Sequence, residues 1–370
     1  MWIETFELER RQSIWENHVS FNLTESGIHP YTLNELFKDE ELEELLNLRL
    51  GYGQTNGSIE LRNVIAALYE DQTPSNILVT SGSSEANFIA MHTLLEVGDE
   101  IVYMIPNYLQ IWGLARSMNV TVNTFRLHEE LNWQPDIQEL KDLVTEKTKM
   151  IVVCNPNNPT GSVLNRESIE AIIGLAGEFD AYIYADEVYR GAELDGKETE
   201  SFLNLYDKTI VCSGLSKSYA LPGVRIGWLA GPEDIIEKCW SHRDYTSISS
   251  SVLSQEIAVR ALQPDKRSDI LDRNRNILRE NLNIIQDWQD QENMFEYIPP
   301  KAGGMAFFKY QIDINSTELT NQLRKDKSVF LVAGDCFGMD HYLRIGFGAE
   351  KNYLKEGLIL FSKYLSDLSR

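Results

Sequence analysis

The sequence lacks several features that would each point to a particular class of protein. Its four cysteines are far apart and form no C-x-x-C pair, and its six histidines show no ligand spacing, so we expect no metal site and no disulfide framework. No segment approaches 18 uncharged apolar residues, and the charged N-terminus contains no signal-peptide core. We therefore expect a cytoplasmic protein with free thiols and no membrane partner.

Positive charge is also scarce. The chain has 34 Lys and Arg residues against 56 Asp and Glu residues, which gives a formal net charge of −22. Such a surface repels the phosphate backbone of nucleic acids, so we expect no nucleic-acid partner. An anionic ligand would have to be held by a few local donors. A length of 370 residues with 43% hydrophobic residues is typical of a globular protein with about two domains.

Short apolar runs alternate with stretches of helical spacing such as "SSEANFIAMHTLLEVG" and "NRESIEAIIGLAGEFD". Near-continuous apolar strands separated by helices predict an α/β fold with a mostly parallel, seven-stranded sheet flanked by helices. The seven predicted strands are residues 76–80, 100–105, 120–125, 149–154, 181–187, 209–214 and 225–231.

The pattern changes after Gly231. One long helical stretch is predicted from about Ser251 through "DKRSDILDRNRNILRENLNIIQDWQDQ", and shorter strands and helices follow it. This pattern of short strands and helices predicts a smaller α+β domain, and we expect the first 45 residues to pack with it. The predicted division is a large domain over residues 46–265 and a small domain made of residues 1–45 and 266–370.

Polar residues follow several of the predicted strands. In "SGSSEA" (81–86), small residues precede a helix; this is typical of an anion site at a helix N-terminus, and equally of simple N-capping. The loop "CNPNNPTGSVL" (154–164) follows a strand at the sheet edge where ligands of open α/β sheets bind, and Asn158 offers an amide there.

Two ionisable residues raise the question of a cofactor. Asp186 in "YADEVY" ends a buried strand, and such a carboxylate needs a cationic partner, for example a protonated heterocyclic nitrogen. Lys217 lies in "VCSGLSKSYALPGVRIGW", where it is either a surface turn residue or a reactive amine. In the second interpretation burial lowers its pKa from the usual value of about 10.4.

Together with "LRIGFG" (343–348), these segments resemble the fold-type-I pyridoxal-phosphate enzymes of the class I/II aminotransferase family, in the family's order and over most of the chain. The resemblance implies that residues 46–265 bind pyridoxal 5′-phosphate. It makes Lys217 the lysine that forms a Schiff base with the cofactor and Asp186 the partner of the ring nitrogen. Asn158 and Tyr189 would bond the ring's phenolate oxygen, and Tyr108 would stack on the ring.

The resemblance also implies how phosphate and substrate are held. Its phosphate ligands would be Gly82, Ser83, Ser84, Ser216 and Arg225. Tyr52 would reach across a homodimer interface to the partner's phosphate, so that the active sites are shared. Arg344, with its planar fork, would bind the substrate's α-carboxylate, beside Asn158 and a covering loop that contains Gly27.

The function implied is an aminotransferase that moves an amino group between an L-amino acid and a 2-oxo acid. No second arginine can be placed for a dicarboxylate side chain, and we assign no role to Met305, Arg243 or Tyr245. An alternative is a pyridoxal-phosphate lyase or cyclase that acts by β- or γ-elimination, similar to capreomycidine synthase or a C–S lyase. A non-catalytic pyridoxal-phosphate-binding regulator is disfavoured because every catalytic position is filled and no DNA-binding appendage is present.

Overall fold

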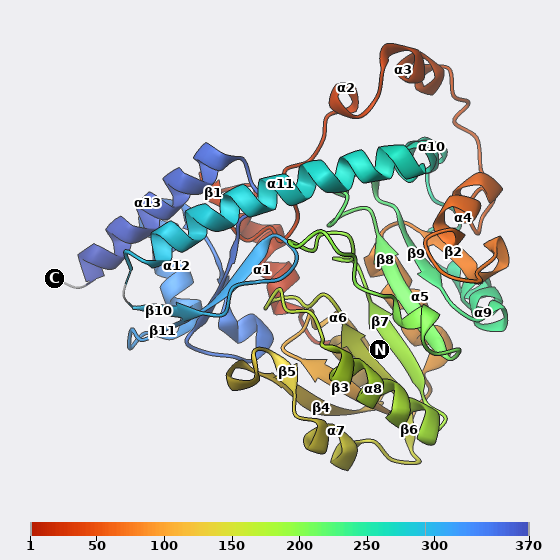
Figure 1. The fold of residues 1–370 in the computed structure, drawn as a ribbon, viewed down its shortest axis with the longest axis horizontal. Helices are drawn as coiled ribbons and strands as arrows, with labels where there is room; N and C mark the ends of the chain where they lie inside the picture. The colour runs from red at the N-terminus through yellow and green to blue at the C-terminus, as the bar shows by residue number, and fades with distance from the viewer. Residues whose placement is uncertain (1, 293, 369–370) are drawn as a thin grey trace.

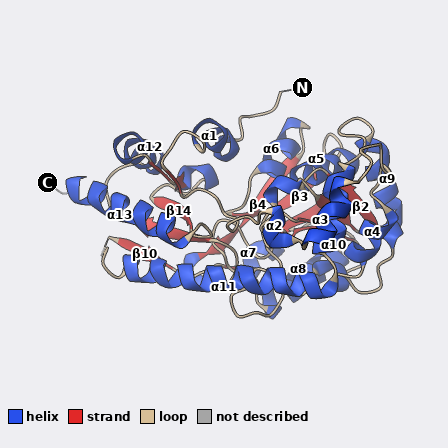
Figure 2. Cartoon of the chain, turned by 90° about the horizontal axis from the view of Figure 1, so that it is seen from above, coloured by secondary structure: helices blue, strands red, loops and turns tan. Residues whose placement is uncertain are grey.

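The computed structural model describes residues 2–292 and 294–368, which contain a large eight-stranded sheet, a smaller four-stranded sheet and a two-stranded pair (Figures 1 and 2). All seven predicted runs form strands of the large sheet, and its central strands are parallel, so the predicted sheet is confirmed. An eighth strand, which was not predicted, has only two residues and pairs with one edge. The strand order is β2 (Ile77–Thr80), β9 (Gly227–Ala230), β8 (Thr209–Gly214), β7 (Tyr182–Asp186), β6 (Thr148–Cys154), β3 (Glu100–Ile105), β4 (Thr121–His128), β5 (Gln134–Pro135).

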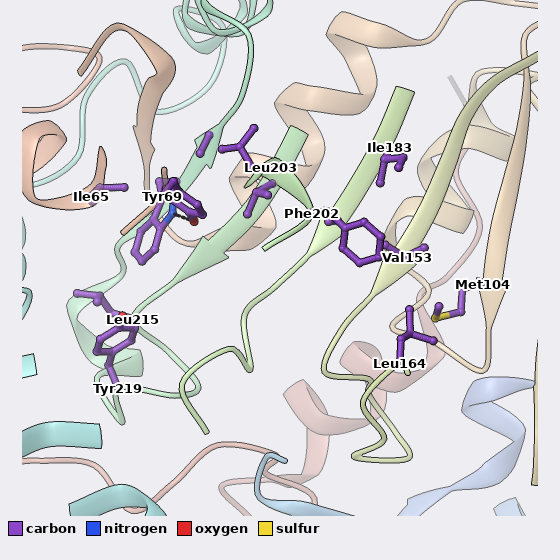
Figure 3. Packing of buried hydrophobic residues seen from close by; sticks show 14 of the residues in the cluster. Ile65, Tyr69, Met104, Val153, Leu164, Ile183, Phe202, Leu203, Leu215 and Tyr219 are labelled. Carbon is purple, nitrogen blue, oxygen red and sulfur yellow. Dashed lines mark hydrogen bonds between the residues drawn. The ribbon is translucent and has the colours of Figure 1, made fainter. Parts of the chain in front are cut away.

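Helices cover both faces of the large sheet. Successive residues of a strand point to opposite faces, and in the central strands the residues on both faces are apolar, so both faces are buried. Along β6, Met150 and Val152 pack in the core on one face, and Ile151 and Val153 pack in the core on the other. Figure 3 shows side chains of this second core, including Val153 and Ile183. The first face is covered by α5 (Ser83–Leu94), α6 (Gln110–Ser117) and α9 (Glu233–Arg243), and the second by α4 (Ile59–Ala66), α7 (Ile137–Leu143), α8 (Arg166–Glu178) and α10 (Val252–Ala261).

The smaller sheet is antiparallel, as expected for the α+β part of the chain. Its order is β10 (Phe295–Tyr297), β11 (Met305–Tyr310), β14 (Tyr342–Gly346), β13 (Val332–Ala333), with α12 (Ser316–Lys327) and α13 (Lys351–Leu368) beside it. Single turns of 3₁₀ helix are η1 (Pro74–Asn76), η2 (Glu129–Leu131), η3 (Phe202–Asn204), η4 (Pro222–Val224) and η5 (Gly334–Phe337). Within the described ranges, no helix combines the length and the apolar character needed to cross a membrane.

The N-terminal segment contacts both cores. Strand β1 (Phe21–Asn22) pairs with β12 (Val329–Phe330). This pair belongs to the smaller unit, the part of the molecule that packs around the core of the smaller sheet. The buried side chains of α1 (Glu7–Trp15), α2 (Leu33–Leu36) and α3 (Asp39–Leu46) belong instead to the core of the large sheet. The division of the chain into residues 46–265 and the remainder stays a prediction.

The long helical stretch is interrupted, which corrects the prediction of a single helix. Helix α10 ends at Ala261, and α11 (Pro264–Gln289) begins at a proline. Proline has no backbone N–H and disfavours helical geometry at the residue before it, and Gln263 is accordingly extended, with ψ at 140°. Proline suits the first position of a helix, so the break falls there.

Helix α11 joins the two parts of the molecule (Figure 1). The buried residues of its apolar stripe pack in the two cores. Ile270 and Leu271 pack in the core of the large sheet, whereas Leu278 and Ile285 pack in the core of the smaller unit. The helix therefore holds the small unit against the edge of the large sheet.

Candidate active site

The predicted site residues come from separate loops that meet at one edge of the large sheet. The neighbouring parallel strands β6, β7 and β8 end at this edge, and α5 begins just after β2. Loops after the carboxyl ends of parallel strands are where such sheets bind ligands. Ten predicted residues line a cavity of about 230 Å³, namely Ser83, Ser84, Tyr108, Asn158, Asp186, Tyr189, Ser216, Lys217, Arg225 and Arg344.

One end of the cavity concentrates groups that bind anions. Gly82 has a φ of 93° and immediately precedes the first residue of α5. A Cβ on Gly82 would overlap the guanidinium of Arg225, and a Cβ on Gly227 would overlap the backbone N of Ser83. These glycines therefore let the helix N-terminus, the guanidinium and the Ser216 hydroxyl, 3.4 Å from Nη1 of Arg225, lie together. This arrangement fits a phosphate group.

A buried carboxylate lies deeper in the cavity. Asp186 accepts a hydrogen bond from the backbone N–H of Val188 at 3.1 Å, and no cationic side chain of the described residues forms an ion pair with it. Burial raises its pKa to about 6, although the Val188 N–H and the charge of Lys217 oppose this. A carboxylate in this state is well suited to a protonated ring nitrogen, which would supply the missing opposite charge.

Arg344 is 1% exposed and lies on β14, the strand that faces the cavity from the smaller unit. Its Nη1 donates to Oδ1 of Asn158 at 2.7 Å, and its Nη2 donates to the carbonyl oxygen of Thr24 at 2.6 Å. Its Nε has no hydrogen-bond partner. Because Oδ1 of Asn158 accepts from Arg344, the amide Nδ2 of Asn158 remains as a donor.

Two tyrosines complete the walls. The hydroxyl of Tyr189 donates to Oγ of Ser26 at 2.8 Å, and the hydroxyl of Tyr108 donates to Oε1 of Glu9 at 2.8 Å. Phe6 packs edge-on against the ring of Tyr108, with the ring centroids 4.8 Å apart. The ring of Tyr108 is thus held by Phe6 and at its hydroxyl.

Lys217 faces the cavity with its side chain 27% exposed, and it is not neutral. Its Nζ lies 2.8 Å from Oε1 of Glu25. Burial lowers the pKa of Lys217, but the Glu25 carboxylate, together with Tyr189, outweighs this and raises the pKa to about 12. In return, the Lys217 ammonium holds the pKa of Glu25 down at about 2. The expectation of a net lowering of the lysine's pKa is therefore wrong for the chain alone, because a charged partner opposes the effect of burial.

Sequence reasoning missed several residues that line the cavity. They include Glu25 and Ser26. They also include Leu8, Glu9 and Gln12 of helix α1, and Glu16, which directly follows this helix. The spacing of Glu9, Gln12 and Glu16 is i, i+3, i+7, which places them on one face of a helix. That spacing was a detectable signal of a shared polar face, but polar faces usually turn to solvent.

Several residues do not line the cavity. Tyr52 is 91% exposed, and Gly27 is buried with its N–H donated to Oε1 of Glu25 at 2.7 Å. Arg243 is buried among Thr55, Ser247 and Ser250, so it ties together the segment before β2 and the segment after α9.

Two other unassigned positions also lie outside the cavity. Tyr245 is 90% exposed, and Met305 packs behind the site against Val188 and Tyr189. Among the residues that the structure describes, no group of three or more His, Cys, Asp or Glu side chains is placed to hold a metal ion.

Comparison with known proteins shows the family. Residues 21–358 match the family model for aminotransferase class I and II, and the chain belongs to that family. Its fold matches that of a pyridoxal-phosphate-dependent aminotransferase from Streptococcus suis with a TM-score of 0.93 and 34% sequence identity, over 99% of both chains. The predicted family and fold are confirmed, as is the prediction of a pyridoxal-phosphate-dependent aminotransferase.

Two curated relatives are similar over nearly their whole lengths. Capreomycidine synthase from Streptomyces vinaceus is 28% identical, over 94% of this chain and 90% of the relative. Aspartate aminotransferase from Thermotoga maritima is 27% identical, over 98% of this chain and 96% of the relative. The chain is therefore similar both to an aminotransferase and to a protein named as a synthase.

Proposed function

We propose that this chain binds pyridoxal phosphate at the cavity and moves an amino group between an L-amino acid and a 2-oxo acid. The observation that carries the proposal is that Lys217, Asp186 and Arg344 face one cavity from three separate parts of the chain. An amine, an unpaired buried carboxylate and an arginine with an unpartnered Nε are the three groups that the chemistry needs.

The chain's own groups would hold the cofactor at both ends. The N-terminus of α5 at Ser83 and Ser84, together with Gly82, Ser216 and Arg225, would bind the phosphate. Asp186 would keep a proton on the ring nitrogen, and Tyr108 would lie against the ring. The Nδ2 of Asn158 and the hydroxyl of Tyr189 would donate to the ring oxygen.

When bound, pyridoxal phosphate supplies an aldehyde that takes up the donor's amino group and a ring that accepts electrons from its Cα–H bond. The amine of Lys217 would then remove the Cα proton and return it to the former aldehyde carbon, acting as base and then as acid. For this step Lys217 must be neutral, so its pair with Glu25 has to be weakened once substrate is present. Arg344 would hold the donor's carboxylate through its fork and keep Cα in place.

A half-reaction tests the transaminase proposal. Cofactor-loaded protein mixed with an amino donor, without any acceptor, is expected to yield one equivalent of 2-oxo acid and to convert the cofactor to its pyridoxamine form. Mass spectrometry of the products and the visible spectrum measure both. The similarity to capreomycidine synthase favours a lyase or cyclase as the second candidate. Release of ammonia, or a cyclic product with unchanged cofactor, would identify that reaction and reject transamination.

We also propose a homodimer in which Tyr52 completes the partner's phosphate site. The support is its exposed ring, which is close in the sequence to other exposed apolar side chains, among them Leu46 and Leu50. Mixing Lys217→Ala chains with Tyr52→Phe chains is expected to restore activity, because one of the two sites in each hybrid is then intact. Activity of the mixture equal to the sum of the separate variants would contradict shared sites.

Four buried free thiols support a reducing location such as the cytoplasm.

A further inference from the structure

We propose that the amino donor carries a second cation on its side chain, a diamino or guanidino amino acid, which binds the acidic face of α1 and Glu25. This inference rests on the proposed function, because it names the substrate class of the same site. Two observations carry it. Three carboxylates, those of Glu9, Glu16 and Glu25, line the cavity, and the cavity leaves charged groups without a partner of opposite charge.

The N-terminal helix turns its polar face into the cavity. Glu9, Gln12 and Glu16 lie on that face, and all three line the site. The helix is held in this orientation from its other side, because Arg11 donates to Thr320 and Asn321 of α12 at 3.1 and 3.0 Å. The acidic face is therefore a wall of the site.

Gln12 places this wall next to the carboxylate-binding arginine. Its Nε2 donates to Oγ1 of Thr24 at 2.9 Å, and the carbonyl oxygen of Thr24 accepts from Arg344 at 2.6 Å. Glu9 and Glu16 lie about one helical turn on either side of Gln12, and Glu25 follows Thr24 in sequence. A substrate whose α-carboxylate is at Arg344 would therefore extend its side chain along these carboxylates.

The carboxylates have unused capacity for a cation. Glu16 is half-buried, and its carboxylate forms no hydrogen bond or ion pair with any of the described residues. Burial and the negative charges of Glu25 and Glu9 raise its pKa. Glu9 uses Oε1 to accept from Tyr108, which leaves its Oε2. The ion pair of Glu25 is with Lys217, the amine that the proposed reaction requires, so Glu25 needs another cation when Lys217 is engaged.

A second observation marks the other end of the ligand. The Nε of Arg344 is buried and unpartnered, although Arg344 lines the same cavity. Once Arg225 pairs with a phosphate, Asp186 with a ring nitrogen and Arg344 with an α-carboxylate, the three glutamates remain without a positive charge. A substrate side chain that ends in an ammonium or guanidinium supplies that charge, whereas a dicarboxylate would be repelled. A cation beside Glu25 would also weaken its hold on Lys217 and let the lysine's pKa fall.

The experiment compares cationic donors with neutral donors of similar side-chain length. L-arginine is compared with L-citrulline, and L-lysine with L-norleucine, in the half-reaction of the cofactor-loaded protein. We expect kcat/KM for each cationic donor to exceed that of its neutral counterpart by about 10²-fold, with L-glutamate as the poorest donor. In Glu16→Gln and Glu9→Gln this ratio should fall about tenfold each, which corresponds to about 1.4 kcal/mol. Glu7→Gln is the matched control, because Glu7 is exposed on α1 and does not line the site.

A binding measurement keeps the inference separate from the reaction type. Equilibrium dialysis of the cofactor-loaded protein with 5-guanidinopentanoate and 5-ureidopentanoate uses ligands that have no α-amino group and cannot react. Tighter binding of the guanidino compound, reduced in Glu16→Gln but not in Glu7→Gln, supports the inference even if no donor is transaminated. Equal binding of the two compounds overturns it. Turnover of neutral or acidic donors without preference for cationic ones also overturns it, while leaving the aminotransferase proposal intact.

Discussion

A Lys217→Ala variant reconstituted with pyridoxal phosphate is expected to lose transamination by about 10⁴-fold, the upper end of what general acid–base catalysis contributes. The variant also loses the amine that would bond the cofactor's aldehyde. In the wild type, borohydride should fix the visible chromophore to one peptide, and mass spectrometry should locate it at Lys217. In the variant, no fixed chromophore is expected.

Two further variants separate this loss from a loss of folding. Lys217→Arg retains a positive charge beside Glu25, so it preserves the 2.8 Å pair's charge balance while removing the nucleophilic amine. It should unfold close to the wild-type temperature and be as inactive as Lys217→Ala. Lys208→Ala removes an exposed lysine that pairs with Asp180 and should retain both colour and turnover. A borohydride-fixed chromophore on any lysine other than Lys217 would reject the assignment.

The large sheet was predictable because its strands are buried on both faces. Strands such as β6 and β8 are near-continuous apolar runs that match the predicted ranges closely, and the loops after them were placed correctly at one edge. The interruption before α11 was missed although Pro264 was visible, because the helical pattern continues on both sides of it. Strand β5 has two residues, too few for any periodicity.

The site was predictable where a residue ends a strand, as Asp186 does, or follows one closely, as Lys217 does. The N-terminal wall was not, since nothing in the sequence indicates that Glu16 lies beside residues of a distant loop. The same reason explains the wrong direction for the pKa of Lys217. Its partner Glu25 is 192 positions earlier in the chain, and only the fold brings the two charges to 2.8 Å. Electrostatics in a site depend on such long-range neighbours, whereas strand burial depends on local pattern.

Asp186 links the stability of the chain to its chemistry. Its pKa is raised from 3.8 to about 6 by burial, so the folded chain binds this proton more tightly than the unfolded chain does. As pH rises from about 4 to 6, the unfolded chain gives up the proton first, and the ionised carboxylate then lowers the free energy of unfolding. Above pH 6 the free energy of unfolding is lowered by the full amount, about 3 kcal/mol, because each unit of pKa difference is worth about 1.4 kcal/mol.

Replacing Asp186 by Asn is therefore expected to stabilise the cofactor-free chain and to impair the enzyme. At pH 7.5 the variant should unfold with up to about 3 kcal/mol more free energy than the wild type. The difference should become small near pH 4, where the wild-type carboxyl is protonated in the folded chain and about half protonated in the unfolded chain. The amide retains an acceptor for the Val188 N–H but cannot balance a cationic ring nitrogen. Turnover should fall by about 10²- to 10³-fold, the cost of removing one preorganised electrostatic group.

Denaturant unfolding across pH 4 to 8, and the rise in Tm on adding pyridoxal phosphate, measure the two effects. The rise in Tm should be smaller in Asp186→Asn than in the wild type, because the cofactor no longer relieves a buried charge. Glu187→Gln is the matched control. Glu187 is also buried, and burial raises its pKa to about 7. It accepts hydrogen bonds from the Ser201 hydroxyl and the Phe202 N–H, and it does not line the cavity. It should change the pH dependence of stability while retaining the cofactor-dependent rise in Tm. An Asp186→Asn protein that gains as much from the cofactor as the wild type would show that Asp186 does not meet the cofactor's charge.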